Sequence, residues 1–250
     1  MRSTDAAIAA PSQVEKPIRA ELFGIERLEQ HAESLAGAQR VTDEPSKGRY
    51  LLPRVRENAR ALLAGYRNVA ETVRDKGEIT PAAEWLLDNF HVVEEQIRGI
   101  RDHLPGSYYR LLPKIAEGHL TGYPRVYGLV WAYVAHTDSR FELETLQRFV
   151  SAYQRVQPLT SGELWAVPIH LRVALVENLR RRSHLIVRSR QARARADELA
   201  DRLLGLSGRP AEPADDALRR LGDAPLRRAF AVQLVQRLRD QGPSIMPALL

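Results

Sequence analysis

Apolar side chains recur every three or four residues over most of the chain beyond Leu52, and this spacing constrains the fold more than any other feature. Such a period places apolar side chains on one face of an α-helix, whereas a half-buried strand would need strict alternation. No window of the sequence shows a sustained alternation. We therefore predict an all-α fold, a multi-helix array of mostly antiparallel helices that includes one long, proline-kinked helix.

Start and stop signals place the first predicted helices. One helix begins at Leu52 and ends at Gly77, a residue suited to the left-handed conformation that follows many helices. Thr80 and Pro81 form an N-cap followed by proline at the first helical position, so a second helix begins there. A short helix is expected around residues 111–116.

Two segments match a capping box, in which a Ser or Thr and a Glu three residues later satisfy each other's free backbone amides. Ser139–Glu142 would begin one helix, and Thr160–Glu163 would begin a long helix that continues to Leu204. Pro168 lies inside this long helix, where it removes one amide donor and is expected to kink the helix.

Composition shifts divide the chain into four expected segments. Residues 1–50 form a loosely structured N-terminal segment, and residues 51–204 form a helical core module. Residues 205–224 are a Gly/Pro linker, and residues 225–250 hold a C-terminal helix with a truncated continuation. The apolar residues that this last helix is expected to turn inward are Phe230, Leu234 and Leu238.

Positive charge is concentrated in one stretch. The 250 residues carry a formal net charge of +6, and between Arg172 and Arg202 nine arginines oppose four acidic residues. Such a stretch fits an anionic membrane surface, nucleic acid phosphates, or a solvated or domain-contact face, and nucleic acid is the weakest of these alternatives. The candidate residues for an anionic surface are Arg180, Arg181, Arg182, Arg188 and Arg190.

Missing residues and motifs exclude several kinds of chemistry. There is no Cys, so disulfides, thiolate metal sites and cysteine catalysis are ruled out. No Gly-rich nucleotide-binding motif, zinc-protease motif or nucleophile elbow is present. His91 and Glu95 lie one helical turn apart but lack a third metal ligand nearby. We therefore predict no catalytic residue, no metal site and no cofactor bound by this chain itself.

The sequence also lacks signals for membrane insertion and export. Its longest uninterrupted apolar stretch, Tyr127 to Ala135, has nine residues and is too short to cross a bilayer. The first ~20 residues after Met1 lack the apolar core of a secretory signal. We expect a soluble, cytoplasmic chain.

Polar and aromatic residues in the middle of the chain are open to two interpretations. His136 and Asp138 could form an acid–base pair with Arg140 holding an anion, or Asp138 could cap the following helix. Aromatic residues cluster between residues 108 and 133, and their flat faces suit sugar stacking. The helical spacing of Trp131 and its aromatic neighbours also fits packing in the core.

Longer strings are specific enough to indicate a family. Residues 84–98, EWLLDNFHVVEEQIR, resemble the N-terminal region of cyclic β-1,2-glucan synthases. Further strings with the same resemblance are YYRLLP (108–113), GYPRVY (122–127), AHTDSRF (135–141), QPLTSGELWAVP (157–168) and ENLRR (177–181). The strings are long and non-repetitive, and the resemblance extends over residues 50–245.

The resemblance implies that this chain is a fragment of a much larger protein. Such synthases are bacterial inner-membrane proteins that join a glycosyltransferase module, several membrane spans and a C-terminal phosphorylase-like domain. Their donor is UDP-glucose. This chain has no D-x-D motif and no pattern of a transferase sheet or phosphorylase barrel. Its implied place is the cytoplasmic face of the inner membrane, and its implied partners are the transferase and membrane parts of the same synthase and the β-1,2-glucan chain.

Two functional hypotheses follow. The first is a non-catalytic helical module that supports glucosyl transfer by the full-length synthase. The alternative is a basic helical binding module for nucleic acid or an anionic membrane surface. If the module binds sugar, the candidate stacking residues are Trp85, Tyr123, Trp131 and Trp165. The candidate polar contacts are His136, Asp138, Arg140 and Glu163.

Overall fold

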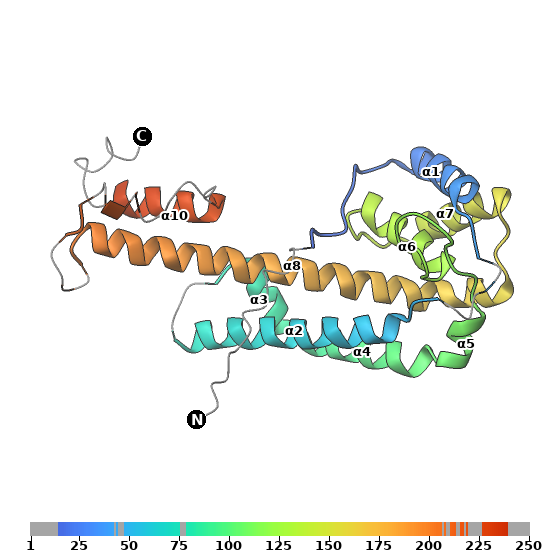
Figure 1. Cartoon of the computed structure of the whole chain (residues 1–250), viewed down its shortest axis with the longest axis horizontal. Helices are drawn as coiled ribbons and strands as arrows, with labels where there is room; N and C mark the ends of the chain where they lie inside the picture. The colour runs from blue at the N-terminus through green and yellow to red at the C-terminus, as the bar shows by residue number, and fades with distance from the viewer. Residues whose placement is uncertain are drawn as a thin grey trace, which may run out of the picture. The chain divides into compact units, whose positions relative to one another are not determined.

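The computed structural model describes residues 15–42, 44, 48–75, 79–206, 208, 211–213, 216–217, 219 and 227–239. Within these residues the regular structure is helical, and pairing between extended segments is limited to isolated bridges, so the all-α prediction is confirmed. In chain order the helices are α1 (Ile25–Ala38), α2 (Leu51–Arg74), α3 (Pro81–Asp88), α4 (Phe90–His103), α5 (Gly106–Leu111), α6 (Arg125–His136), α7 (Leu143–Val156), α8 (Ser161–Leu203) and α10 (Arg228–Arg239) (Figure 1). None of the described helices combines the length and apolarity that a membrane span requires.

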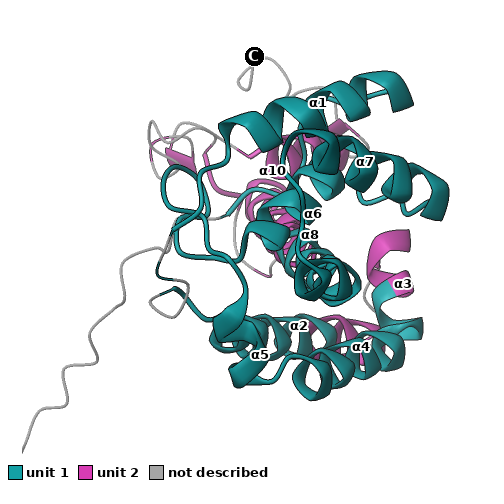
Figure 2. Cartoon of the chain, turned by 90° about the vertical axis from the view of Figure 1, so that its right-hand side faces the viewer, with its two compact units in different colours: residues 1–66, 86–182 teal, residues 67–85, 183–250 magenta. Residues whose placement is uncertain are grey.

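The chain divides into two compact units, which Figure 2 shows in different colours. Unit 1 comprises residues 1–66 and 86–182, and unit 2 comprises residues 67–85 and 183–250. The division falls within α2, α3 and α8, so these helices contribute residues to both units. Each unit therefore combines stretches that are distant in the sequence.

Unit 1 has an extensive apolar core that is centred on α6. This helix is buried on most of its circumference, and its residues from Val126 to Val130 are enclosed. Phe149 of α7, Ile100 of α4 and Leu62 of α2 are also fully buried in this core. Each such side chain stabilises the fold by about 1.5–3 kcal/mol through removal of apolar surface from water.

The N-terminal part of unit 1 is more ordered than the sequence indicated. Although residues 1–50 were expected to be loosely structured, α1 is a regular helix that packs along α7 (Figure 1). Its buried face consists of Leu28, Ala32 and Ala36, and small alanines give only a weak apolar period. Ion pairs such as Glu29–Arg148, at 2.5 Å, connect the two helices at the surface. Residues 1–14, 43 and 45–47 lie outside the described residues.

Several predicted boundaries are confirmed. The first long helix is α2, and its predicted end at Gly77 lies outside the described residues. α3 begins at Pro81, and the Thr80 hydroxyl accepts a hydrogen bond from the amide of Ala83 at 3.3 Å. α8 begins after Thr160 and contains Pro168, as expected.

Two local predictions are wrong. The helix expected around residues 111–116 is not present, because α5 ends at Leu111 and an extended connection follows it. Pro113 favours this extended connection, since the residue before a proline avoids the helical region. The capping box at Ser139 does not form. Asp138 and Ser139 have φ angles of 50° and 68°, so this left-handed turn places them outside α7, which begins at Leu143.

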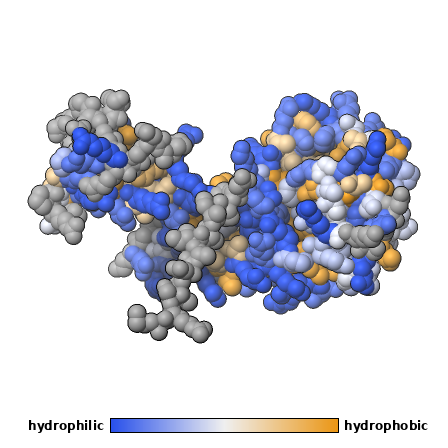
Figure 3. Space-filling model, in the orientation of Figure 1, coloured by the Kyte–Doolittle hydropathy of each residue, from blue (hydrophilic) through white to orange (hydrophobic). Residues whose placement is uncertain are grey.

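Unit 2 has its own small core. The second half of α8 packs against α10 through apolar side chains on one face of each helix. The α8 residues are Ala192, Ala196, Leu199, Ala200 and Leu203, and the α10 residues are Phe230, Leu234 and Leu238, which are the residues predicted to face inward. Much of the predicted linker 205–224 and residues 240–250 lie outside the described part of the chain. In Figure 3 hydrophilic residues cover most of the visible described surface, and apolar residues form only small patches on that face.

Candidate functional site

A pocket of about 280 Å³ in unit 1 collects charged and aromatic side chains from four parts of the chain. We call it the charged pocket. Its lining residues are Glu15, Arg49, Leu51, Arg54, His119, Leu120, Tyr123, Tyr127, Trp131, Glu177 and Arg181. They come from the segment before α1, from the start of α2, from α6 with the connection before it, and from α8. Its volume is close to the lower end of known small-ligand sites, about 300–1,000 Å³.

Glu177 is the buried anion of this pocket. Its side chain is 1% exposed, and its carboxylate accepts hydrogen bonds from Arg54 Nε at 2.9 Å, Asn58 Nδ2 at 2.7 Å and Arg181 Nε at 2.7 Å. Arg180 Nη2 also lies 3.0 Å from it. Burial alone would raise the pKa of Glu177, but the hydrogen bonds from Arg54, Arg181 and Asn58 outweigh it and lower the pKa to about 2. The carboxylate therefore stays ionised throughout the neutral range.

A second carboxylate reaches the same arginines from the N-terminal side. Glu15 belongs to residues 15–23, which we call the strap, and it pairs with Arg54 and Arg180. The backbone of Ile18 exchanges hydrogen bonds with the side chain of Asn178, and its amide donates to Asn178 Oδ1 at 2.7 Å. Burial works against ionisation of Glu15, yet the hydrogen bond from Arg54 and the nearby arginines hold its pKa below the ordinary value.

Aromatic rings form the other wall of the charged pocket. Tyr127 is buried, and its ring centroid lies 5.7 Å from those of both Tyr123 and Trp131. The guanidinium of Arg181 lies over the ring of Trp131, 4.9 Å from its centroid, and that of Arg49 lies 5.9 Å from the centroid of Tyr123. Planar rings next to fixed hydrogen-bonding groups can bind a sugar or another small polar ligand.

Comparison with known proteins finds a relative that is similar to most of the chain. No protein-family model matches the chain. The chain is 39% identical over 236 residues, 91% of its length, to the cyclic β-(1,2)-glucan synthase NdvB of Rhizobium meliloti (strain 1021). The chain is homologous to part of a cyclic β-1,2-glucan synthase. It spans only 8% of that synthase's length, and the resemblance seen in the sequence strings is confirmed.

Two of the candidate sugar-stacking residues of this synthase homologue meet in the charged pocket. Tyr123 and Trp131 both line it, together with Arg181 from the set predicted for anionic surfaces. Trp165 is 82% exposed and Trp85 is 51% exposed, and neither lines the charged pocket. The structure thus brings together a subset of the predicted residues.

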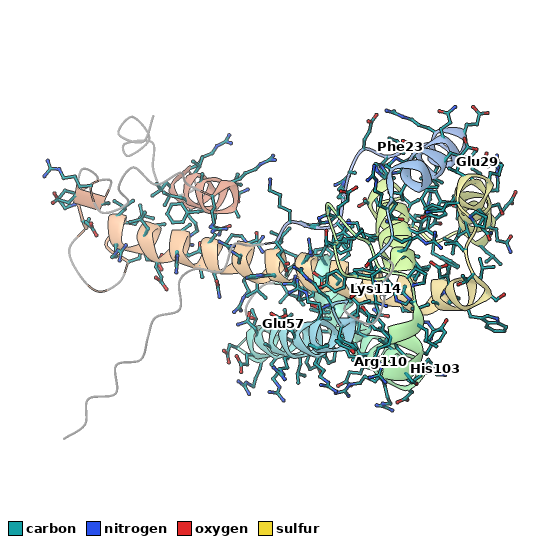
Figure 4. All side chains as sticks on the ribbon, turned by 45° about the vertical axis from the view of Figure 1, so that its right-hand side comes forward. Phe23, Glu29, Glu57, His103, Arg110 and Lys114 are labelled. Carbon is teal, nitrogen blue, oxygen red and sulfur yellow. The ribbon has the colours of Figure 1, made fainter. Side chains whose placement is uncertain are left out.

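The candidate polar residues lie elsewhere in unit 1. His136 and Arg140 line a separate pocket, also of about 280 Å³, where His136 Nδ1 lies 2.7 Å from the backbone oxygen of Glu21. The His136 ring stacks on Phe23, which Figure 4 labels, with their centroids 4.0 Å apart. Asp138 pairs with Arg182.

Glu163 has a structural position. It is fully buried, and its carboxylate accepts hydrogen bonds from Arg125 Nε at 2.8 Å and Nη2 at 2.5 Å. The predicted capping box is also present, because the Thr160 amide donates to Glu163 at 2.9 Å and the Glu163 amide donates to Thr160 Oγ1 at 3.2 Å. In this arrangement Glu163 anchors the start of α8 to α6.

The arginine-rich stretch is partly directed inward. Arg180 and Arg181 pair with Glu15 and Glu177, and Arg182 pairs with Asp138. Arg188 and Arg190 belong to unit 2 and are partly buried. Arg180, Arg181 and Arg182 are therefore each paired with a carboxylate of the same chain.

Four charged residues that shape the pocket were not predicted from the sequence, namely Glu15, Arg49, Arg54 and Glu177. The spacing within each helix was a partial signal. Arg54 and Asn58 lie one turn apart on α2, and Glu177 and Arg181 lie one turn apart on α8. The pairing of these two helix faces could not be derived from their spacing. In the described residues no group of three or more His, Asp or Glu is placed to hold a metal ion.

Lys114 fixes the connection that supplies His119, Leu120 and Tyr123 to the pocket. This lysine, labelled in Figure 4, is 1% exposed and donates hydrogen bonds to the carbonyls of Tyr109 at 2.7 Å and Leu112 at 2.5 Å. Burial lowers its pKa to about 8. Gly48 leaves room for it, since a Cβ at residue 48 would lie 2.7 Å from Lys114 Cε.

His170 is fully buried in α8, and we therefore expect the stability of the fold to decrease in acid. Its Nδ1 lies 2.8 Å from the carbonyl of Ala166, and burial lowers its pKa from 6.5 to about 4. Between pH 6.5 and about 4 the unfolded chain takes up a proton that the folded chain excludes, so the free energy of unfolding should fall as the pH falls. Urea denaturation across this range should show a shallower pH dependence for His170→Leu than for the parent.

The exposed His103, labelled in Figure 4, offers a matched control. His103→Leu should retain the pH dependence of the parent. If His170→Leu also retained it, His170 would not be the group whose proton uptake destabilises the fold.

Proposed function

We propose that this chain is a helical module from the N-terminal, cytoplasmic region of a cyclic β-1,2-glucan synthase. The module has no complete active site and supports glucosyl transfer from UDP-glucose by the full-length enzyme. Its partners are the transferase and membrane parts of the same synthase and the growing β-1,2-glucan. Support comes from the 39% identity to a glucan synthase, and from the absence of a D-x-D motif in the sequence.

The charged pocket is the part of the module that we assign to the glucan. Tyr123 and Trp131 supply ring edges and faces, while Arg49 and His119 supply hydrogen-bond donors at its rim. Arg181 occupies one side of Trp131, so a sugar would approach the ring from the remaining accessible part. The observation that carries this assignment is the co-location of two stacking candidates with charged groups in one pocket of a glucan synthase homologue.

A fluorescence titration tests this assignment. In a Trp85→Phe/Trp165→Phe background, Trp131 is the remaining tryptophan, because the sequence has three. Linear β-1,2-gluco-oligosaccharides should change its emission saturably. Tyr123→Ala should weaken binding about three- to tenfold, as expected for the loss of one aromatic contact of about 0.5–1.5 kcal/mol.

Two controls define the result. Maltose-type α-linked oligosaccharides should give a smaller response at equal concentration, and Tyr50→Ala, an exposed tyrosine that does not line the pocket, should leave binding unchanged. If β-1,2-gluco-oligosaccharides produce no change up to tens of millimolar, the module does not hold the glucan at this pocket. Only the scaffold role towards the other parts of the synthase would then remain.

A further inference from the structure

The arginine cluster of the charged pocket has more positive charge than its own carboxylates neutralise. Arg54, Arg180 and Arg181 contact the two carboxylates that line the pocket, those of Glu177 and Glu15, and Arg54 also pairs with the exposed Glu57, which does not line it. Within the described residues no carboxylate pairs with Arg49, which also lines the pocket. The cluster therefore retains excess positive charge beside an open cavity.

The two carboxylates differ in how firmly they are held. Glu177 is 1% exposed and rooted in α8. The side chain of Glu15 is 39% exposed, and the backbone anchors of the strap begin three residues later, at Ile18. Lys16 lies between Glu15 and Ile18 in the sequence, and its carbonyl accepts a hydrogen bond from Arg181 Nη1 at 2.8 Å. Glu15 can therefore leave the arginines without breaking the bonds between Ile18 and Asn178.

The arginines also have hydrogen-bonding capacity that the carboxylates leave unused. Arg180 pairs with both carboxylates of the pocket although it does not itself line it, and within the described part of the chain its buried Nε has no hydrogen-bond partner. A planar carboxylate offers two oxygens, whereas a phosphate group offers three or four and carries more negative charge. Guanidinium groups bind phosphate oxygens through paired, charge-assisted hydrogen bonds.

We propose that the charged pocket binds a phosphate group, either free or as the ester of a small molecule, and that Glu15 is the internal ligand which this anion displaces. The strap then acts as a built-in competitor, because its carboxylate occupies the arginines whenever the phosphate is absent. This inference goes beyond the glucan role, since its ligand is an anion and its binding requires no sugar.

The test uses Trp131 as a reporter, because the Arg181 guanidinium lies over its ring. The full chain carrying Trp85→Phe and Trp165→Phe is titrated with inorganic phosphate at constant ionic strength, with chloride as the counter-anion. Glu15→Gln should tighten phosphate binding about tenfold or more, the effect of removing one competing charged hydrogen-bonding group. Glu21→Gln is the matched control, because Glu21 also belongs to the strap but pairs with Arg27 outside the pocket, and it should leave the affinity unchanged.

A second variant keeps the test independent of the strap. Arg49 is exposed, so Arg49→Gln should fold normally and weaken phosphate binding about two- to fivefold. A comparison of inorganic phosphate with glucose 1-phosphate then distinguishes a site for the free ion from a site for an ester, according to which binds more tightly.

The proposal is overturned if a folded Glu15→Gln chain, verified by circular dichroism, binds phosphate no better than its parent. It is equally overturned if Arg49→Gln leaves a measurable affinity unaltered. Phosphate binding without a response to neutral β-1,2-gluco-oligosaccharides would support this inference and contradict the glucan site. A response to the oligosaccharides without phosphate binding would support the glucan site and overturn this inference.

Discussion

Replacing Glu177 with alanine is expected to lower the free energy of unfolding by about 3–5 kcal/mol, the usual cost of removing one partner from a buried ion pair. The carboxylate is 1% exposed and accepts hydrogen bonds from Arg54, Asn58 and Arg181. Its loss would leave the guanidinium groups of Arg54 and Arg181 next to one another, with Glu15 and the exposed Glu57 as the remaining anionic partners among the described residues. Urea denaturation followed by far-ultraviolet circular dichroism measures the change.

Glu57→Ala is the matched control for this substitution. Glu57, labelled on α2 in Figure 4, pairs with Arg54 at 3.1 Å, but its side chain is 65% exposed. Its removal should change the free energy of unfolding by less than about 1 kcal/mol because exposed ion pairs contribute little. Equal losses for Glu57→Ala and Glu177→Ala would show that burial of the carboxylate does not determine its contribution.

The carboxylate of Glu177 should also affect the free energy of unfolding in acid. Its pKa lies at about 2 in the folded chain, below the ordinary value of 4.5. Its contribution is therefore fully present above pH 4.5 and is lost as the pH falls through 2. Glu177→Gln should lose less stability than the parent over that interval, because the amide does not titrate.

Replacing Glu163 with alanine is also expected to cost about 3–5 kcal/mol. Arg125 is 5% exposed, and without Glu163 its guanidinium would lose its carboxylate partner and keep the longer bond to the carbonyl of Pro158, at 3.3 Å. The substitution also removes half of the capping box, so the amide of Thr160, the residue before α8, loses the carboxylate that accepts its hydrogen bond. Thermal and urea denaturation should both report the loss.

A double-mutant cycle tests whether the pair acts as a unit. Arg125→Met and Glu163→Leu should each be strongly destabilising, and the double variant should be destabilised by less than the sum, because neither charge is then left buried alone. Additive effects would indicate that the two side chains contribute independently.

Local patterns predicted the helices well because their signals are close together in sequence. The cap at Thr80 and the capping box at Thr160 depend on neighbouring residues alone, and both are present in the structure. The same kind of pattern failed at Ser139, whose hydroxyl instead accepts a hydrogen bond from Asn178 Nδ2 at 2.7 Å. A residue 39 positions away decided that turn, and no local rule includes such a partner.

The candidate site was harder to predict for the same reason. Tyr123 and Trp131 were identified from their residue types, since aromatic rings are the usual sugar platforms. Arg54 was not, because an arginine on an amphipathic helix ordinarily faces water. Arg54 becomes part of a pocket because α2 packs beside Glu177, which lies 123 positions further along the sequence. Glu163, in contrast, was chosen for its polarity and serves the fold.

The bond between Ile18 and Asn178 has a consequence for the order in which the protein can assemble. The two residues are 160 positions apart, and ribosomes add about 5–20 residues per second, so the strap emerges on the order of ten seconds before its partner exists. Arg54 waits almost as long for Glu177, from which it is separated by 123 positions. The charged pocket is therefore a late product of translation, completed only when α8 has been synthesised.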